Sequence, residues 1–319
     1  MQTDSKRALV LSGGGGRGAY HIGVLNYLES HGWRPDIIVG TSIGAVNGAT
    51  LGSGIPVAAL RERWLDLTTD DVQKMRADDV YIDNLVRGGR HVFDTTPLLA
   101  TLKGHSKKWL GKPWVIPEIL NSAESHYEVW ITAVDVETRQ LVYFNNREAN
   151  GITAEKVQAS CSIPLWYEPT TINRRTYLDG GVIANTPFRK ALELGATEIV
   201  VVLMAPLPGQ TPRASRIAAP PLPDDELLAI PQRLWSAFEP ALDMLLTEIV
   251  WNDYRLFEAQ RRAGEFSEVQ WLHCVAPTVP LPVGLMTTYD RNYHIRLIRQ
   301  AEEDARATLD EVLQAATAD

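Results

Sequence analysis

The pattern of apolar and polar residues predicts that strands and helices alternate along most of this chain. Short apolar runs between turn residues predict strands buried on both faces, and apolar residues spaced three and four apart predict helices. In chain order, the predicted elements are a strand at 7–11, a helix at 18–31, a strand at 36–40, a helix at 43–53, strands near 127–135 and 141–144, a helix that Thr153 caps and that ends near Ser160, a hairpin over 170–179, a helix that Thr186 caps and Gly195 ends, and a strand at 199–203. This alternation predicts an α/β fold, a three-layer α/β/α sandwich around a mostly parallel sheet.

Two regions interrupt the alternation. Residues from about 64 to 124 lie between a predicted helix and the next predicted core strand, and we expect a lid insertion there. Residues 206–231 are rich in proline and show little periodicity, which predicts a mobile loop or linker. Beyond them, two amphipathic helices are expected to close the sandwich. We therefore predict a core over 6–205 and, over 206–319, a proline-rich loop with a helical extension that packs on the core.

The first candidate for chemistry is a serine between two glycines at the end of the strand at 36–40. Gly40-Thr41-Ser42-Ile43-Gly44 joins that strand directly to a helix. A sharp turn of this kind lifts a serine hydroxyl out of a sheet, and the flanking glycines permit the strained backbone. The pattern alone is weak, because chance produces it in roughly one chain of this length in ten.

A glycine-rich loop follows the first predicted strand. Ser12-Gly13-Gly14-Gly15-Gly16-Arg17-Gly18 lacks side chains at successive positions, so its N–H groups can approach a phosphate or an oxyanion. The spacing of its glycines also fits a dinucleotide-binding loop. Such a site needs a carboxylate at the end of the second strand, where this chain has Gly40-Thr41-Ser42. No Gly-Lys-Ser/Thr follows, which excludes a P-loop.

A third motif is Asp179-Gly180-Gly181, at the end of the predicted hairpin. Two glycines leave the carboxylate on an open turn that another loop could approach. Taken alone, Asp-Gly is an ordinary turn dipeptide whose aspartate is solvated.

In chain order, the glycine-rich loop, the serine turn and Asp-Gly-Gly resemble the motifs of the patatin-like phospholipase family. The block Ala159-Ser160-Cys161-Ser162-Ile163-Pro164-Leu165-Trp166-Tyr167-Glu168-Pro169 is similar to another motif of that family. The resemblance implies a lipid acyl-ester hydrolase with a serine–aspartate dyad, in which Ser42 is the nucleophile and Asp179 the base. It implies an oxyanion hole at Gly14, Gly15 and Gly16, supported by Arg17. The remaining motif glycines would support these loops: Gly13, Gly18, Gly40, Gly44, Gly180 and Gly181.

Other functions on the same scaffold stay open. A thioesterase or an acyltransferase would form the same acyl-serine, and a non-catalytic acyl-binding regulator would keep the pocket without turnover. A Ser-His-Asp triad would need a histidine after Asp179, and only His273 and His294 meet that condition. His273 lies in a strand-like run and His294 on a helix face that we expect to be solvated, so the dyad is favoured.

Composition limits the remaining possibilities. A net charge of −8 and a pI near 5.5 argue against nucleic acid as a partner. No apolar run is long enough for a transmembrane helix, and we see no signal peptide. Cys161 and Cys274 form no metal-binding pattern, so we expect no metal or cofactor and a reducing cytoplasmic location. The oligomeric state stays open.

One segment contrasts with the acidic background. Four of the eight lysines and two tryptophans fall together: Lys103, Lys107, Lys108, Trp109, Lys112 and Trp114. Lysine and tryptophan are typical of membrane-interface segments, which predicts peripheral contact with the inner membrane face. The alternative is a solvated loop whose tryptophans pack into the lid.

The proposed base sets one more expectation. An aspartate has an unperturbed pKa of about 3.9, and partial burial should raise it while backbone donors and Arg17 hold it down. We therefore expect the acid limb of activity below about pH 6.

Overall fold

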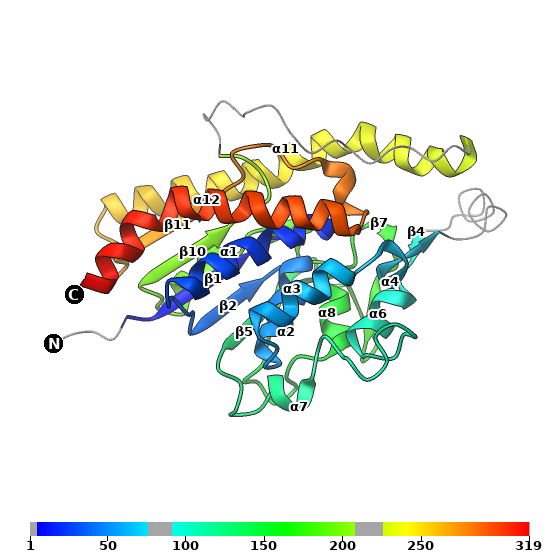
Figure 1. Cartoon of the computed structure of the whole chain (residues 1–319), viewed down its shortest axis with the longest axis horizontal. Coiled ribbons are helices and arrows are strands. Elements are labelled where there is room, and N and C mark those ends of the chain that lie inside the picture. The colour runs from blue at the N-terminus through cyan, green and yellow to red at the C-terminus, as the bar shows by residue number, and fades with distance from the viewer. Residues whose placement is uncertain (1–4, 76–90, 208–225, 319) are drawn as a thin grey trace.

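The computed structural model describes residues 5–75, 91–207 and 226–318 and has one large, mostly parallel sheet at its centre (Figure 1). The strands follow the order β11-β10-β1-β2-β5-β9-β8, and β6 pairs with the other edge of β5. The pairs from β11 to β5 are parallel, whereas β6, β9 and β8 pair antiparallel. The strand bounds are β1 Arg7–Leu11, β2 Ile37–Gly40, β5 Glu128–Asp135, β6 Gln140–Asn145, β8 Thr170–Ile172, β9 Arg175–Asp179, β10 Glu198–Val202 and β11 Trp271–Val275.

The sheet is apolar on both faces because helices cover each one. In β1, Leu9 and Leu11 pack into one hydrophobic cluster, and Ala8 and Val10 pack into another on the opposite face. The first cluster holds the helices α1 Ala19–Ser30, α2 Ile43–Gly52, α3 Val57–Asp66, α8 Ala154–Ser160 and α12 Arg291–Ala318. The second holds α10 Phe188–Glu193 and part of α11 Glu226–Arg262. The predicted three-layer sandwich is therefore confirmed.

The C-terminal helix α12 lies along α1, and Figure 1 shows the two side by side. Tyr20 donates a hydrogen bond of 2.8 Å to Asp304, and Asn26 donates one of 3.0 Å to Glu302. These side chains join the N-terminal and C-terminal parts of the described chain into one layer.

The segment predicted as a lid insertion forms a small lobe beside the sandwich. Its described elements are α4 Thr69–Val72, β3 Lys74–Met75, β4 His91–Asp94, α6 Thr96–Leu102 and α7 Pro117–Leu120. Strand β7, Leu165–Tyr167, pairs with β4, so the block at 159–169 connects this lobe to the core. Residues 76–90 lie outside the described residues.

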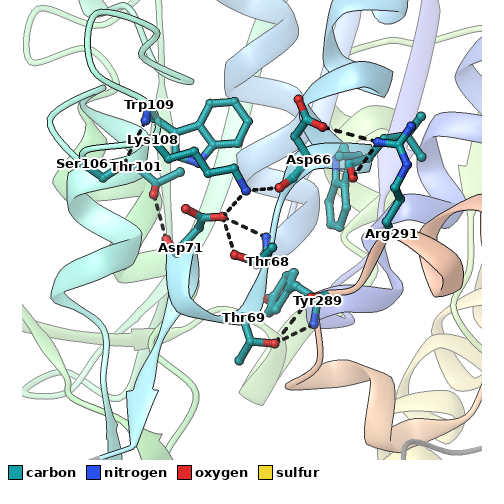
Figure 2. A network of polar contacts seen from close by, with 12 residues as sticks. Asp66, Thr68, Thr69, Asp71, Thr101, Ser106, Lys108, Trp109, Tyr289 and Arg291 are labelled. Atoms are coloured by element: carbon teal, nitrogen blue, oxygen red, sulfur yellow. Dashed lines mark hydrogen bonds and ion pairs between the residues drawn. The ribbon is translucent and has the colours of Figure 1, made fainter.

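Polar side chains fix the lobe (Figure 2). Lys108 donates to the Asp71 carboxylate at 3.0 Å and to the backbone carbonyl of Asp66. The same carboxylate caps α4, accepting from the N–H and hydroxyl of Thr68. On the other side, the Tyr289 N–H donates to Thr69 at 3.1 Å.

This packing corrects the prediction for the two tryptophans of the lysine- and tryptophan-rich segment and agrees with the alternative, in which they pack into the lid. Trp109 and Trp114 are 4% and 1% exposed and pack edge-to-face with each other, so the indoles are not at a membrane boundary. Lys103 pairs with Glu155 at 2.5 Å, and Lys108 is held as described above. The tryptophans form the core of the lobe because indole rings bury a large apolar area.

Two local predictions also need correction. Helix α10 starts at Phe188 with Pro187 at its N-cap, and the buried Thr186 hydroxyl makes no capping hydrogen bond. Helix α11 begins at Glu226, inside the segment predicted as a loop, because Glu226-Leu227-Leu228-Ala229 are strong helix formers. The rest of that proline-rich prediction, 208–225, lies outside the described residues. The hairpin at 170–179 and the Thr153 cap of α8 are confirmed.

Candidate active site

Strand β5 brings the elbow serine and the Asp-Gly-Gly turn together. The last residue of β2, Gly40, pairs with Ile131, and the last residue of β9, Asp179, pairs with Ala133. Since β6 occupies the opposite edge of β5 at both positions, β2 and β9 lie along the same edge. They run in opposite directions, so their carboxyl ends meet with Thr132 between them. Ser42 and Asp179 are therefore neighbours although 137 residues separate them in the chain.

Ser42 has the strained backbone expected of a nucleophile elbow. Its φ of 55° and ψ of −123° lie outside the common regions for a residue with a side chain. The Ser42 N–H donates a hydrogen bond of 2.9 Å to the hydroxyl of Ser160, at the end of α8. This hydrogen bond from the block at 159–169 is buried and helps to keep Ser42 in its strained conformation. Ser42 itself is 5% exposed.

Asp179 is buried and hydrogen-bonded. It is 4% exposed, and its carboxylate accepts a 2.7 Å hydrogen bond from the Gly181 N–H. Burial raises the pKa of Asp179 to about 7, because charging a carboxyl away from water is unfavourable, while the Gly181 N–H and the nearby Ser42 hydroxyl favour the charged form and pull in the opposite direction. The sequence predicted the direction of this pKa change but a smaller size.

Hydroxyl groups tie the two loops to each other. Thr41, next to Ser42, donates a hydrogen bond of 3.0 Å to the carbonyl of Ala184, in the turn helix α9 Gly181–Ala184 that follows Asp179. Because the Thr41 proton is used there, Thr132 donates to Thr41 at 2.7 Å. This chain of hydroxyls fixes the elbow relative to the aspartate turn.

The glycine-rich loop lies directly against Ser42. A Cβ on Gly13 would come within 3.1 Å of the Ser42 Cβ, and the Gly13 N–H already donates to the Asn185 carbonyl. The loop then enters the 3₁₀ helix η1, Gly15–Gly18. Gly15 has a φ of +56°, and a Cβ there would lie 1.9 Å from the Met286 carbonyl. Since the first N–H groups of a helix have no partner within it, the loop can offer donors from Gly14 and Gly15, each of which lines a cavity together with Ser42.

Arg17 lies beneath this loop. It is 1% exposed, and its guanidinium donates to the Met204 carbonyl at 3.5 Å. It lines a small cavity with Thr186 and Trp251, apart from the space above Ser42. Any support that Arg17 gives the donors is therefore through the loop backbone.

Ser42 lies between two cavities of different size. On the outside, a pocket of about 390 Å³ includes Ser42, Asp179, Gly14 and Asn185. Its other lining residues are Ile163, Pro164, Leu165, Trp166, Gly181, Val182, Leu245, Ile249 and Met286. On the inside, about 30 Å³ remains between Ser42, Cys161, Trp114 and Tyr289, room for about one or two water molecules. Of these two cavities, only the outer one therefore has room for an apolar ligand of more than a few atoms.

A family model matches the part of the chain that carries the serine, the buried carboxylate and the glycine-rich loop. The family model "Patatin-like phospholipase" matches residues 9–192, more than half of the chain. The chain belongs to the patatin-like phospholipase family. The match contains all three motifs and the block at 159–169.

Curated relatives of this patatin-like chain are much longer proteins. Lysophospholipase NTE1 of Lodderomyces elongisporus is 27% identical over 206 residues, which is 64% of this chain and 13% of that protein. Lysophospholipase NTE1 of Candida albicans is 26% identical over 209 residues, with the same shares. The chain thus spans about an eighth of the length of these relatives.

Solved structures similar to this patatin-like chain include VipD from Legionella pneumophila. VipD has a TM-score of 0.49 and 14% identity, over 97% of this chain and 67% of VipD. The type III effector protein ExoU has a TM-score of 0.42 and 15% identity, over 98% of this chain and 54% of ExoU.

The two histidines considered for a triad lie elsewhere in this patatin-like fold. His273 is in β11, which β10 and β1 separate from β2. His294 is fully buried, so the expectation of a solvated side chain is wrong. Its Nδ1 donates to the Trp64 carbonyl at 2.6 Å, and burial lowers its pKa to about 4. Among the described residues, no hydrogen bond joins a histidine to Ser42 or Asp179.

Three residues of the site were not singled out from the sequence. Thr132, Ser160 and Asn185 hold the two loops in place. Ser160 lies in the block at 159–169 and Asn185 lies four residues after Gly181, and these positions were the available signal, whereas Thr132 lies in β5, outside the motifs described above. In the described part of the chain, no helix is long and apolar enough to span a bilayer, and no cluster of three metal-ligating side chains occurs.

Proposed function

We propose that this chain hydrolyses acyl esters of lipids, of the phospholipid or lysophospholipid class, with Ser42 and Asp179 as a catalytic dyad. The observation that carries this proposal is that the Ser42 elbow meets the buried carboxylate of Asp179 at the wall of one pocket, where burial raises the pKa of that carboxylate to about 7. A base with a pKa near the working pH is both deprotonated and basic enough to take a proton.

In the first step, Ser42 Oγ attacks the carbonyl carbon of the ester while its proton passes to Asp179. The carbonyl oxygen gains negative charge and accepts hydrogen bonds that the N–H groups of Gly14, Gly15 and Gly16 donate, which stabilises the charge. One donor of this kind is worth about 100-fold to 1,000-fold in rate. When the tetrahedral intermediate collapses, the C–O bond to the alcohol breaks and Asp179 returns the proton to the leaving oxygen.

In the second step, water replaces the alcohol. Asp179 takes a proton from the water, whose oxygen attacks the acyl-serine carbonyl. Collapse releases the fatty acid and returns the proton to Ser42. The same two groups therefore serve both half-reactions, and no third residue is needed.

The pocket supports a lipid substrate. Among its lining residues in the described part of the chain, Asp179 is the only charged one, and most of the others are apolar. A volume of about 390 Å³ suits a flexible acyl chain next to the serine. Two relatives are named lysophospholipases, which agrees with a substrate of this class.

Substitution of the dyad tests the proposal. Ser42→Ala and Asp179→Asn should each lower kcat/KM by more than about a thousandfold, and the double variant should be little worse, because the two residues act as one unit. Turnover is measured on p-nitrophenyl esters and on phospholipids, with products identified by mass spectrometry. A fluorophosphonate should label the wild type and not Ser42→Ala.

His273→Ala serves as the control and should keep its activity. Full activity of Asp179→Asn, together with loss in His273→Ala, would overturn the dyad. Transfer of the acyl group to an added alcohol or thiol, with no free fatty acid, would show that water is not the acceptor.

A further inference from the structure

Large apolar side chains are exposed around the opening of the outer pocket. Leu165, Val182 and Leu245 line the pocket and are 66%, 48% and 60% exposed. Ile183 and Met244, the neighbours of two of them, are 39% and 67% exposed. We refer to these five residues, Leu165, Val182, Ile183, Met244 and Leu245, as the mouth rim.

The mouth rim is assembled from three separate parts of the fold. Leu165 begins β7, Val182 and Ile183 lie in α9, and Met244 and Leu245 lie in α11. Of the large apolar side chains with high exposure in the described chain, more than half line this pocket or are the sequence neighbours of residues that line it. Apolar side chains gathered at one opening mark an interaction site more often than scattered exposed residues do.

Leu165 adds a second and independent observation. Its φ is 72°, a left-handed conformation that is unfavourable for a branched side chain, yet its side chain packs little and points to solvent. At such an exposed position, the energetic cost of the strained backbone is not compensated by packing of the side chain in the core. Such strain is found where function requires a side chain to be presented.

We propose that the mouth rim docks on the surface of a lipid aggregate, so that an acyl ester passes into the pocket without crossing water. This inference rests on the proposed function, because Leu165, Val182 and Leu245 line the same cavity as Ser42 and Asp179. The surface that it fits is zwitterionic or neutral, since the chain carries a net charge of −8 and would be repelled by an anionic bilayer.

Docking of this kind differs from the lysine-rich contact predicted from the sequence. Apolar side chains bind by leaving water, so their binding responds weakly to salt, whereas lysine binding to anionic lipid weakens as salt rises. Leu110 provides the matched control. It is 72% exposed, as much as any residue of the mouth rim, but lies in the lysine-rich segment.

The test measures co-sedimentation with phosphatidylcholine vesicles in a Ser42→Ala background, which prevents hydrolysis. The rim variant combines Leu165→Asn, Met244→Gln and Leu245→Gln. Asparagine tolerates positive φ, and glutamine is a good helix former, so the backbone should be kept. The vesicle partition coefficient should fall at least about tenfold, because burying one such side chain contributes about that much. Leu110→Gln should stay within about twofold, and added salt should change little.

Equal partition of the rim variant and its parent, with matching circular dichroism spectra, would overturn the proposal. So would binding to anionic vesicles alone that disappears with salt. A wild type that is dimeric in solution and becomes monomeric in the rim variant, with vesicle binding unchanged, would show that a second copy covers this surface. Because the binding assay needs no turnover, its result is separate from that of the dyad variants.

Discussion

The loops that carry Gly15 and Gly44, which we call the floor of the site, and the lobe at 64–124 are built in different ways. At the floor, backbone meets backbone: a Cβ on Gly15 would lie 1.9 Å from the Met286 carbonyl, and one on Gly44 would lie 2.1 Å from the Leu11 carbonyl. In the lobe, long side chains make the connections, as Lys108 does with Asp71 (Figure 2). Backbone contacts prescribe glycine at fixed positions, whereas a side-chain network can be made from many residue types.

This difference explains which parts of the sequence were informative. The glycine motifs predicted where the loops lie, because a side chain at Gly15 or Gly44 would meet backbone atoms that cannot turn aside. The lysines and tryptophans at 103–114 suggested a surface patch, because composition does not reveal whether an indole faces inward. In the structure, Trp109 and Trp114 are buried in the lobe, and Lys108 donates a hydrogen bond to Asp71.

Among variants that keep Ser42 and Asp179, the largest effect is expected at the floor, from Gly15→Ala. The added methyl group would meet the Met286 carbonyl, which is backbone and cannot turn aside, so the glycine loop must move. Displacing an oxyanion donor should lower kcat on a soluble ester at least about 100-fold. The measurement is a steady-state rate with a parallel thermal melt.

Gly32→Ala is the matched control for this substitution. Gly32 has a φ of +68°, similar to Gly15, but nothing lies within 4 Å of a Cβ built there. It should lose only the roughly 1 kcal/mol of stability that a left-handed alanine costs, with kcat unchanged. If the two variants behave alike, the close contact at Gly15 does not position the loop.

Much of the fold could be predicted because its signals are local. A buried parallel strand reads as an apolar run, and an elbow or turn reads as glycine beside a polar residue. The meeting of Ser42 with Asp179 could not be derived from spacing, since it depends on the register of both β2 and β9 along β5. The burial of His294 depends on Trp64, 230 residues earlier in the chain. The size of the pKa change at Asp179 depends likewise on surroundings assembled from several elements.

A second prediction concerns the stability of Asp179→Asn. The folded pKa of about 7 lies above the ordinary value of 3.8, so the folded state holds this proton more tightly than the unfolded state. Stability is then greatest at low pH and is lost as pH rises from about 4 through 7. At pH 8 the ionised, buried carboxylate destabilises the wild type, and the asparagine variant should be more stable by up to about 4 kcal/mol.

Urea unfolding of both proteins across this pH range measures the effect. The difference in unfolding free energy should grow between pH 4 and pH 7 and level off above. A difference that does not change with pH would show that Asp179 titrates normally. The same pKa moves the expected acid limb of kcat/KM to about pH 7, above the limit of 6 expected from the sequence.

The smallest effects are expected in the lobe, where Lys103, Lys107, Lys108 and Lys112 are all replaced by Gln. Most of the expected loss in folding stability should come from Lys108, because the side chain of its partner Asp71 is only 9% exposed. The Lys108 side chain is itself 41% exposed and therefore screened, so its pair is worth at most about 1 kcal/mol. Hydrolysis of a soluble ester should be unchanged. Binding to phosphatidylcholine vesicles should stay within about twofold, since the neighbouring indoles are buried and contribute nothing to a surface. A marked loss of binding here, with the rim variant unaffected, would assign membrane contact to the lobe after all.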